Sequence, residues 1–135
     1  MIYYYSKVDP DILLHIVKKY ADIEDGRSDL VPPENFIQCS SLKVNKCHFR
    51  SHQHIYKDGK PQVITQESWV VMNGRVMAIL YDLDGEIISW PVLNRGDILI
   101  TLNGGHGFEV LQDNTIVYEF KTGPYEGQEK DKVFI

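Results

Sequence analysis

Three histidines and one glutamate have the residue types and the spacing of a metal site. His52 and His54 are two positions apart, and in a β-strand such side chains project from the same face. Glu67 offers a carboxylate oxygen from the following β-rich segment, and His106 lies in the glycine-rich stretch 103–108, where the backbone can turn sharply. Three nitrogens and one oxygen leave open positions on a five- or six-coordinate divalent ion, as metal-assisted chemistry requires.

Three further residues are candidates for catalysis beside such an ion. His48 and Arg50 lie on the same face as the two histidine ligands if their strand runs unbroken, so both are expected to line the pocket. Tyr81 is an acid or base by its chemistry, although the sequence does not separate it from Tyr56 and Tyr125. We predict His48, Arg50 and Tyr81 as the groups that move or position a proton.

The elements around these residues are predicted to be β-strands. Short runs rich in β-branched and aromatic residues, separated by turn residues, extend from residue 36 to residue 120. The candidate strands are residues 36–40, 42–49, 62–72, 75–81, 87–93, 98–102, 108–111 and 115–120. The pairs Asn73-Gly74 and Asp84-Gly85 supply the positive φ angles that tight hairpins need. Eight short strands on regular hairpins predict an all-β fold, an antiparallel jelly roll or small β-barrel.

The two ends of the chain are predicted to support this barrel within a single domain, residues 1–135. Residues 1–35 are expected to hold a short strand, a helix and a connector, with Asp9 as the helix cap and Pro10 at its first position. Apolar residues recur at helical spacing after this cap, namely Ile12, Leu13, Ile16, Val17 and Tyr20. Residues 121–135 are expected to form an ordered tail folded back on the barrel, since their apolar end would otherwise lie in water.

The same metal-site residues carry a resemblance to the cupin family. The pattern His52-x-His54, followed by Glu67 and then Gly74, resembles the first cupin motif, and residues 93–97 with His106 resemble the second. The resemblance covers about residues 46–110. It implies a double-stranded β-helix that often binds iron, manganese, nickel or zinc, here on His52, His54, Glu67 and His106.

Two departures from the cupin pattern stand out. Lys46 occupies the position of a usual glycine, and twelve residues separate His54 from Glu67. The extra stretch, residues 55–65, is expected to be a lengthened loop at the barrel mouth, and such a loop can choose the substrate. The segment 118–125 also resembles small uncharacterised cupins found among sugar-nucleotide and surface-polysaccharide biosynthesis proteins.

Three functions of different classes follow from these patterns. The favoured one is a metal-binding cupin that binds or acts on a small polar molecule, such as a carbohydrate derivative. The second is a metal-free sugar-nucleotide ketoisomerase or epimerase with His52 or His54 as the base, and the third is a non-catalytic ligand-binding barrel. Fold alone does not decide among them, nor whether the protein is an enzyme.

Composition limits the partners. The formal net charge of −5 and the pI of about 5.4 leave no basic face for nucleic acid. No run approaches the roughly 20 apolar residues of a membrane span, and the first residues lack a basic, then apolar leader. We therefore expect a cytoplasmic protein with a small-molecule partner. Residues 2–5 form a short aromatic segment too apolar to lie free in water, which predicts a homodimer.

Overall fold

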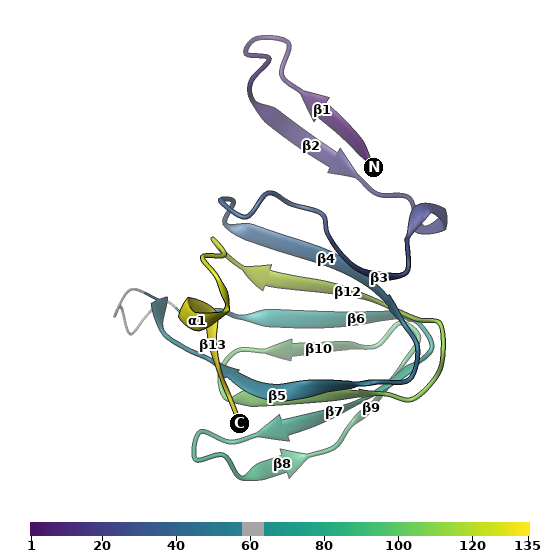
Figure 1. Ribbon diagram of the computed structural model, residues 1–135, viewed down its shortest axis with the longest axis vertical. Helices are drawn as coiled ribbons and strands as arrows, with labels where there is room; N and C mark the ends of the chain where they lie inside the picture. The colour runs from purple at the N-terminus through teal and green to yellow at the C-terminus, as the bar shows by residue number, and fades with distance from the viewer. Residues whose placement is uncertain (58–63) are drawn as a thin grey trace.

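Two antiparallel β-sheets face each other in the computed structural model, which describes residues 1–57 and 64–135 (Figure 1). The five-stranded sheet has the strand order β10 (Ile98–Thr101), β6 (Glu67–Asn73), β12 (Thr115–Thr122), β4 (Ile37–Val44) and β3 (Gly26–Asp29). The six-stranded sheet has the order β13 (Lys132–Phe134), β5 (His48–His54), β11 (Gly105–Val110), β7 (Arg75–Tyr81) and β8 (Ile87–Ser89), and β9 (Val92–Asn94) also pairs with β7. The chain is therefore mainly β, as predicted.

The hydrophobic core lies between the two sheets. Side chains alternate along each strand, so every second residue faces inward. The inward set from both sheets forms one buried cluster, which consists of Leu42, Trp69, Val71, Val76, Ala78, Leu93, Phe108 and Val117. Trp69 of one sheet stacks on Phe108 of the other with ring centroids 3.7 Å apart.

The predicted closed barrel is not what the structure shows. Among the described residues, no ladder joins the five-stranded sheet to the six-stranded one. The chain instead crosses from one sheet to the other at sharp corners. The strand predicted over residues 42–49 is wrong for this reason, since β4 ends at Val44 in one sheet and β5 begins at His48 in the other.

Gly74 makes one of these corners rather than the tight hairpin that we predicted. It joins β6 to β7, which belong to different sheets, and its φ is +90°. A Cβ at this position would lie 2.3 Å from Thr115 Oγ1, so the corner requires glycine. The hairpin predicted at Asp84-Gly85 is confirmed, because β7 and β8 pair across it.

The predicted N-terminal helix is also wrong. Residues 1–19 contain a β-hairpin of β1 (Ile2–Tyr5) and β2 (Leu13–Val17), followed by a 3-10 turn at Tyr20–Asp22. Asp9 caps the hairpin loop instead of a helix, since its carboxylate accepts a hydrogen bond from the Asp11 N–H. Short apolar runs fit either a helix or a strand, and here the cross-strand partners in the aromatic segment decide the outcome.

The C-terminal tail does fold back on the sheets, as predicted. The short helix α1 (Gln128–Asp131) leads into β13, which pairs with β5 so that Lys132 lies opposite His54. Of the lengthened loop predicted at residues 55–65, residues 58–63 lie outside the described part of the chain. Within that described part, the structure holds no helix with the length and apolar character needed to span a membrane.

Candidate metal centre

Four side chains from two neighbouring strands and one facing strand meet between the sheets. His52 and His54 come from β5 and His106 from the adjacent β11, where it lies opposite His52. Glu67 comes from the first position of β6 in the other sheet. One ligand atom of each residue lies within 4.8 Å of the others. The structure thus brings together all four residues that the sequence predicted as metal ligands.

The spacing of the ligand atoms fits one metal ion. The Nε2 atoms of His52 and His106 are 3.2 Å apart, His54 Nε2 is 3.0 Å from Glu67 Oε2, and His106 Nε2 is 3.4 Å from Glu67 Oε1. Ligands bound at about 2.0 to 2.1 Å and separated by about 90° to 110° around an ion lie roughly 3.0 to 3.4 Å from one another. The observed separations are therefore those of neighbouring ligands in one coordination shell.

The outer nitrogen of each histidine is held by an oxygen atom. His52 Nδ1 is 3.1 Å from the carbonyl oxygen of Arg50, and His54 Nδ1 is 3.3 Å from the carbonyl oxygen of Asp131. A carbonyl oxygen only accepts hydrogen bonds, so both rings carry a proton on Nδ1 and turn Nε2 toward the site. His106 Nδ1 is 2.7 Å from the hydroxyl of Thr101, which can also accept. Such partners orient metal-binding histidines and fix their tautomer.

The charges around the site differ among the three histidines. Burial opposes protonation of His54, but hydrogen bonds and attraction from Asp131 and Glu67 outweigh it and raise the pKa of His54 to about 9. Burial, together with the nearby positive charges, lowers the pKa of His52 and of His106 to about 4. Burial likewise opposes ionisation of Glu67, yet its contacts with the histidines hold its pKa well below its usual range. The metal-free protein therefore has two neutral imidazoles and one carboxylate ready for an ion.

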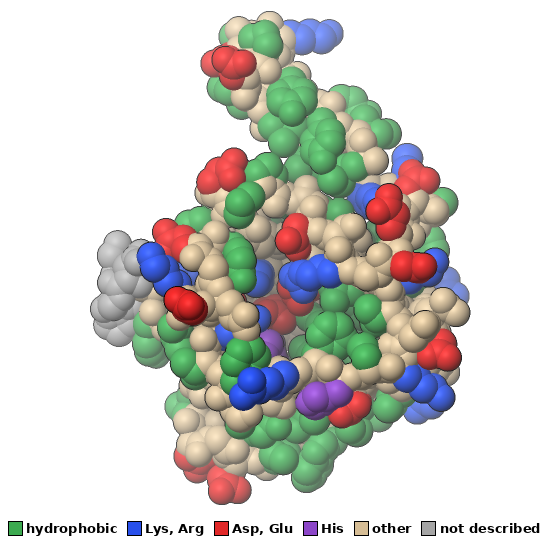
Figure 2. All heavy atoms as spheres, in the orientation of Figure 1, with side chains coloured by type: hydrophobic (Ala, Val, Ile, Leu, Met, Phe, Trp, Pro, Cys, Tyr) green, Lys and Arg blue, Asp and Glu red, His purple; other side chains and the backbone are tan. Residues whose placement is uncertain are grey.

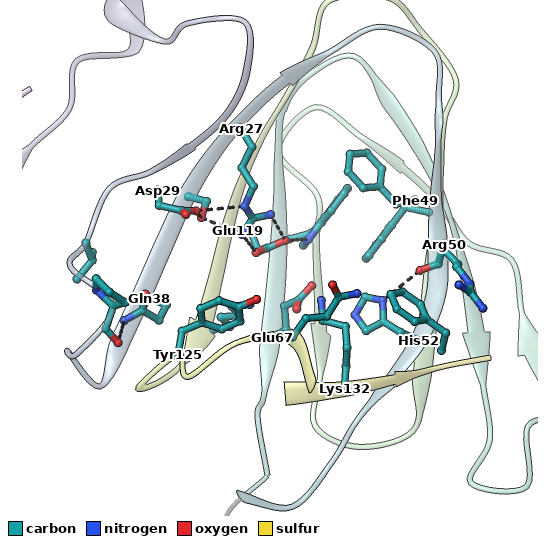
Figure 3. A pocket seen from close by; sticks show the side chains of 18 residues that line it. Arg27, Asp29, Gln38, Phe49, Arg50, His52, Glu67, Glu119, Tyr125 and Lys132 are labelled. Atoms are coloured by element: carbon teal, nitrogen blue, oxygen red, sulfur yellow. Dashed lines mark hydrogen bonds and ion pairs between the residues drawn. The ribbon is translucent and has the colours of Figure 1, made fainter. Parts of the chain in front are cut away.

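A cavity of about 550 Å³ opens beside these ligands, and His52 and Glu67 form part of its base. Figure 2 shows this face hollowed at its centre, with acidic and basic side chains gathered around the hollow. Arg27 crosses one wall, where its guanidinium bonds Asp29 and Glu119, and Trp69 donates its indole N–H to Glu119 at 2.9 Å (Figure 3). These contacts satisfy the charge of Arg27, and they raise its pKa although burial opposes it.

His48 lies outside this cavity because β5 does not run unbroken. His106 pairs with His52, but Phe108, two residues later, pairs with Phe49, so β5 contains one extra residue. This bulge turns Phe49 toward Trp69, with ring centroids 5.3 Å apart, and leaves His48 on the outer face. There His48 Nδ1 is 2.6 Å from Glu109 Oε1.

The other two predicted catalytic residues occupy different places. Arg50 lines the cavity, and its guanidinium lies 4.2 Å from the ring centroid of Phe134. The Tyr81 hydroxyl is 2.8 Å from Ser51 Oγ. Ser51 alternates with His52 along β5, so Tyr81 contacts the outer face of this strand rather than the ligand side.

Several residues of the site carry no signal in the sequence. Thr101 and Asp131 hold the histidines, while Lys121 and Lys132 line the cavity beside Glu67 and His52. Lys121 pairs with Glu67 on the neighbouring strand of one sheet, and Lys132 pairs with His54 on the neighbouring strand of the other. Only the register of distant strands places them there.

The comparisons with known proteins identify the fold. No protein-family model and no curated protein matches the sequence. Among solved structures, KdgF from Halomonas sp. is 16% identical with a TM-score of 0.54, over 74% of this chain and 79% of that one. The cupin domain of Schizosaccharomyces pombe Cnp3 is 8% identical with a TM-score of 0.59, over 90% and 79%. An uncharacterised conserved protein with a double-stranded β-helix domain from Klebsiella pneumoniae is 16% identical with a TM-score of 0.58, over 86% and 88%. The chain therefore has the double-stranded β-helix fold of cupins.

Proposed function

We propose that this protein holds one divalent metal ion and uses the adjoining cavity to bind or convert a small polar molecule. The ligands are His52, His54, Glu67 and His106, and the set suits iron, manganese, nickel or zinc. The observation that carries the proposal is the 3.2 Å separation of the His52 and His106 Nε2 atoms. With both protons on Nδ1, two lone pairs face each other at this distance, and a cation between them turns their repulsion into coordination.

The residues of the chain would orient both the ion and its ligand. When bound, the ion supplies a Lewis acid that polarises an oxygen atom of the substrate. The Nδ1 partners hold the three imidazoles in place, and the Arg27–Glu119 pair fixes the opposite wall. Phe49 and Tyr125 add aromatic surface to a wall that also carries polar groups. Aromatic faces combined with hydrogen-bonding groups favour a carbohydrate derivative as the small molecule.

Elemental analysis of protein purified without chelators or an imidazole column tests the proposal. Wild-type protein should hold about one ion per chain, and His54→Ala and His106→Ala should each lose most of it. The control is His48→Ala, which removes a histidine from the same strand but from its outer face, and it should keep the ion. If the wild type binds no divalent ion, the metal-binding function fails, and an acid–base role for the same histidines becomes the better explanation.

We also propose that the protein is a homodimer. The β1–β2 hairpin projects from the two sheets in Figure 1, and Ile2, Tyr3 and Tyr4 on it are 44%, 46% and 50% exposed. The outer side of the five-stranded sheet exposes apolar Ile98 and Ile100. Exposed apolar surfaces of this kind mark interaction sites. Each chain carries both the hairpin and the exposed sheet surface, so two copies can cover each other's apolar residues. Light scattering at micromolar concentration should give twice the chain mass, and a monomeric mass would contradict this proposal.

A further inference from the structure

Two lysines stand beside the metal ligands at the base of the cavity. Lys121 on β12 pairs with Glu67 across the sheet, and Lys132 on β13 pairs with His54. Their side chains are only 10% and 18% exposed, and both line the cavity. Figure 3 shows Lys132 next to Glu67 and His52, below the pair of Arg27 and Glu119.

The two ammonium groups share a single carboxylate. The Nζ atoms of Lys121 and Lys132 lie 3.6 and 3.8 Å from Asp131 Oδ2, which is longer than a hydrogen bond. The same oxygen is 3.3 Å from His54 Nδ1. Each ammonium has three N–H donors, and leaving such donors without acceptors in a largely buried place costs free energy. The lysines therefore have donors available for an additional acceptor.

The charge balance points to an acceptor that is an anion. Among the described residues, the cavity and its base carry four cationic side chains and four carboxylates, which are Arg27, Arg50, Lys121 and Lys132 against Asp29, Glu67, Glu119 and Asp131. Arg27 already bonds two of these carboxylates. A divalent ion on the proposed site gives these groups a net charge of +2. Because Arg27 is already paired, the positive charge that faces the cavity lies at the two lysines and the ion.

We propose that the ligand of this cavity is a small molecule with a carboxylate group, which Lys121 and Lys132 bind while a neighbouring oxygen of the same molecule approaches the metal. The inference rests on the proposed function, because the excess charge comes from the ion. Two ammonium groups match the two oxygens of a carboxylate, and Arg27 is not available to the ligand because its guanidinium is already paired with Asp29 and Glu119. The cavity volume of about 550 Å³ accommodates a molecule the size of a sugar acid.

Calorimetric titration of metal-loaded protein with gluconate and with sorbitol tests this proposal. The two probes differ only in that a carboxylate replaces a hydroxymethyl group. Gluconate should bind at least tenfold more tightly than sorbitol, and added salt should weaken gluconate binding more. Equal binding of the two, or no binding of gluconate, would overturn the proposal. Tighter binding of sorbitol 6-phosphate than of gluconate would overturn the choice of a carboxylate.

The variants Lys121→Met and Lys132→Met remove one charge each and keep an unbranched side chain. Each should weaken gluconate binding at least tenfold while sorbitol binding stays the same, and Lys132→Arg should restore part of the affinity. Lys130→Met is the matched control, since this side chain is 69% exposed on α1, and it should bind gluconate like the wild type. Metal content is measured on every sample. A wild type without metal defeats the proposed function, whereas a metal-loaded wild type that does not prefer gluconate defeats only this inference.

Discussion

Metal binding should release one proton, and the source of that proton is His54. This imidazole is 2% exposed and lies between the carboxylates of Glu67 and Asp131, which raise its pKa to about 9 although burial opposes it. At pH 7 it is protonated, and the ion must displace the proton from Nε2. The two pH units between 7 and 9 correspond to about 2.7 kcal/mol, or a factor of about 100 in affinity. His52 and His106 contribute no proton, since their pKa values are lowered to about 4.

Titration calorimetry of the chelator-treated protein with Ni²⁺ in two buffers of different ionisation enthalpy measures this proton directly. About one proton per ion should appear at pH 7, and affinity should rise roughly tenfold per pH unit from pH 6 to pH 8. Asp131→Asn removes one of the carboxylates that raise the pKa of His54, so this variant should release less than one proton at pH 7.5. An affinity independent of pH, with no proton released, would refute the argument.

His54 and two other positions give further predictions. Because the folded pKa of His54 exceeds the unfolded value of about 6.5, metal-free protein should lose up to about 3 kcal/mol of stability as pH rises from 6.5 to 9, which a series of melting curves would detect. Thr101→Val removes the oxygen beside His106 Nδ1 and should weaken metal binding about tenfold in the same titration, and an unchanged affinity would show that the hydroxyl does not orient the ring. Gly74→Ala should cost about 3 kcal/mol in denaturant unfolding, since a positive φ and a collision with Thr115 add, whereas Gly26→Ala, at φ +83° in open space, should cost about 1 kcal/mol; equal costs would contradict this reasoning.

His52 and His54 could be predicted as ligands because their relation is local in the sequence, whereas Glu67 and His106 lie 13 and 54 positions from their histidine partners at the site. Two residues apart on a strand is sufficient to put His52 and His54 on one face, and both carry their side chains to the same space. Glu67 and His106 were assigned from their residue types and surroundings, together with the resemblance to the cupin motifs.

The groups that support the ligands could not be predicted, because pairing between distant strands places them. Asp131 is 77 positions from His54 and meets it only because β13 pairs with β5. Lys121 reaches the cavity through the register of β12 against β6. The prediction of an N-terminal helix was wrong for a related reason. Five apolar residues at this spacing fit a helix as well as a strand, and only the partner strand decides between them.

The bulge in β5 has the largest effect on which residues can take part in chemistry. One extra residue between Phe49 and His52 separates the strand into a part that faces the cavity with His52 and His54 and a part that turns His48 to the outer face. The sequence pattern of alternating histidines continues through this point, but the sheet does not follow it. The bulge also brings Phe49 against Trp69, so the aromatic wall and the metal ligands come from consecutive segments of one strand. Among the described residues that line this cavity, Lys121, Tyr125 and Lys132, from the facing sheet and the C-terminal tail, are therefore the candidates for a proton donor to a bound ligand.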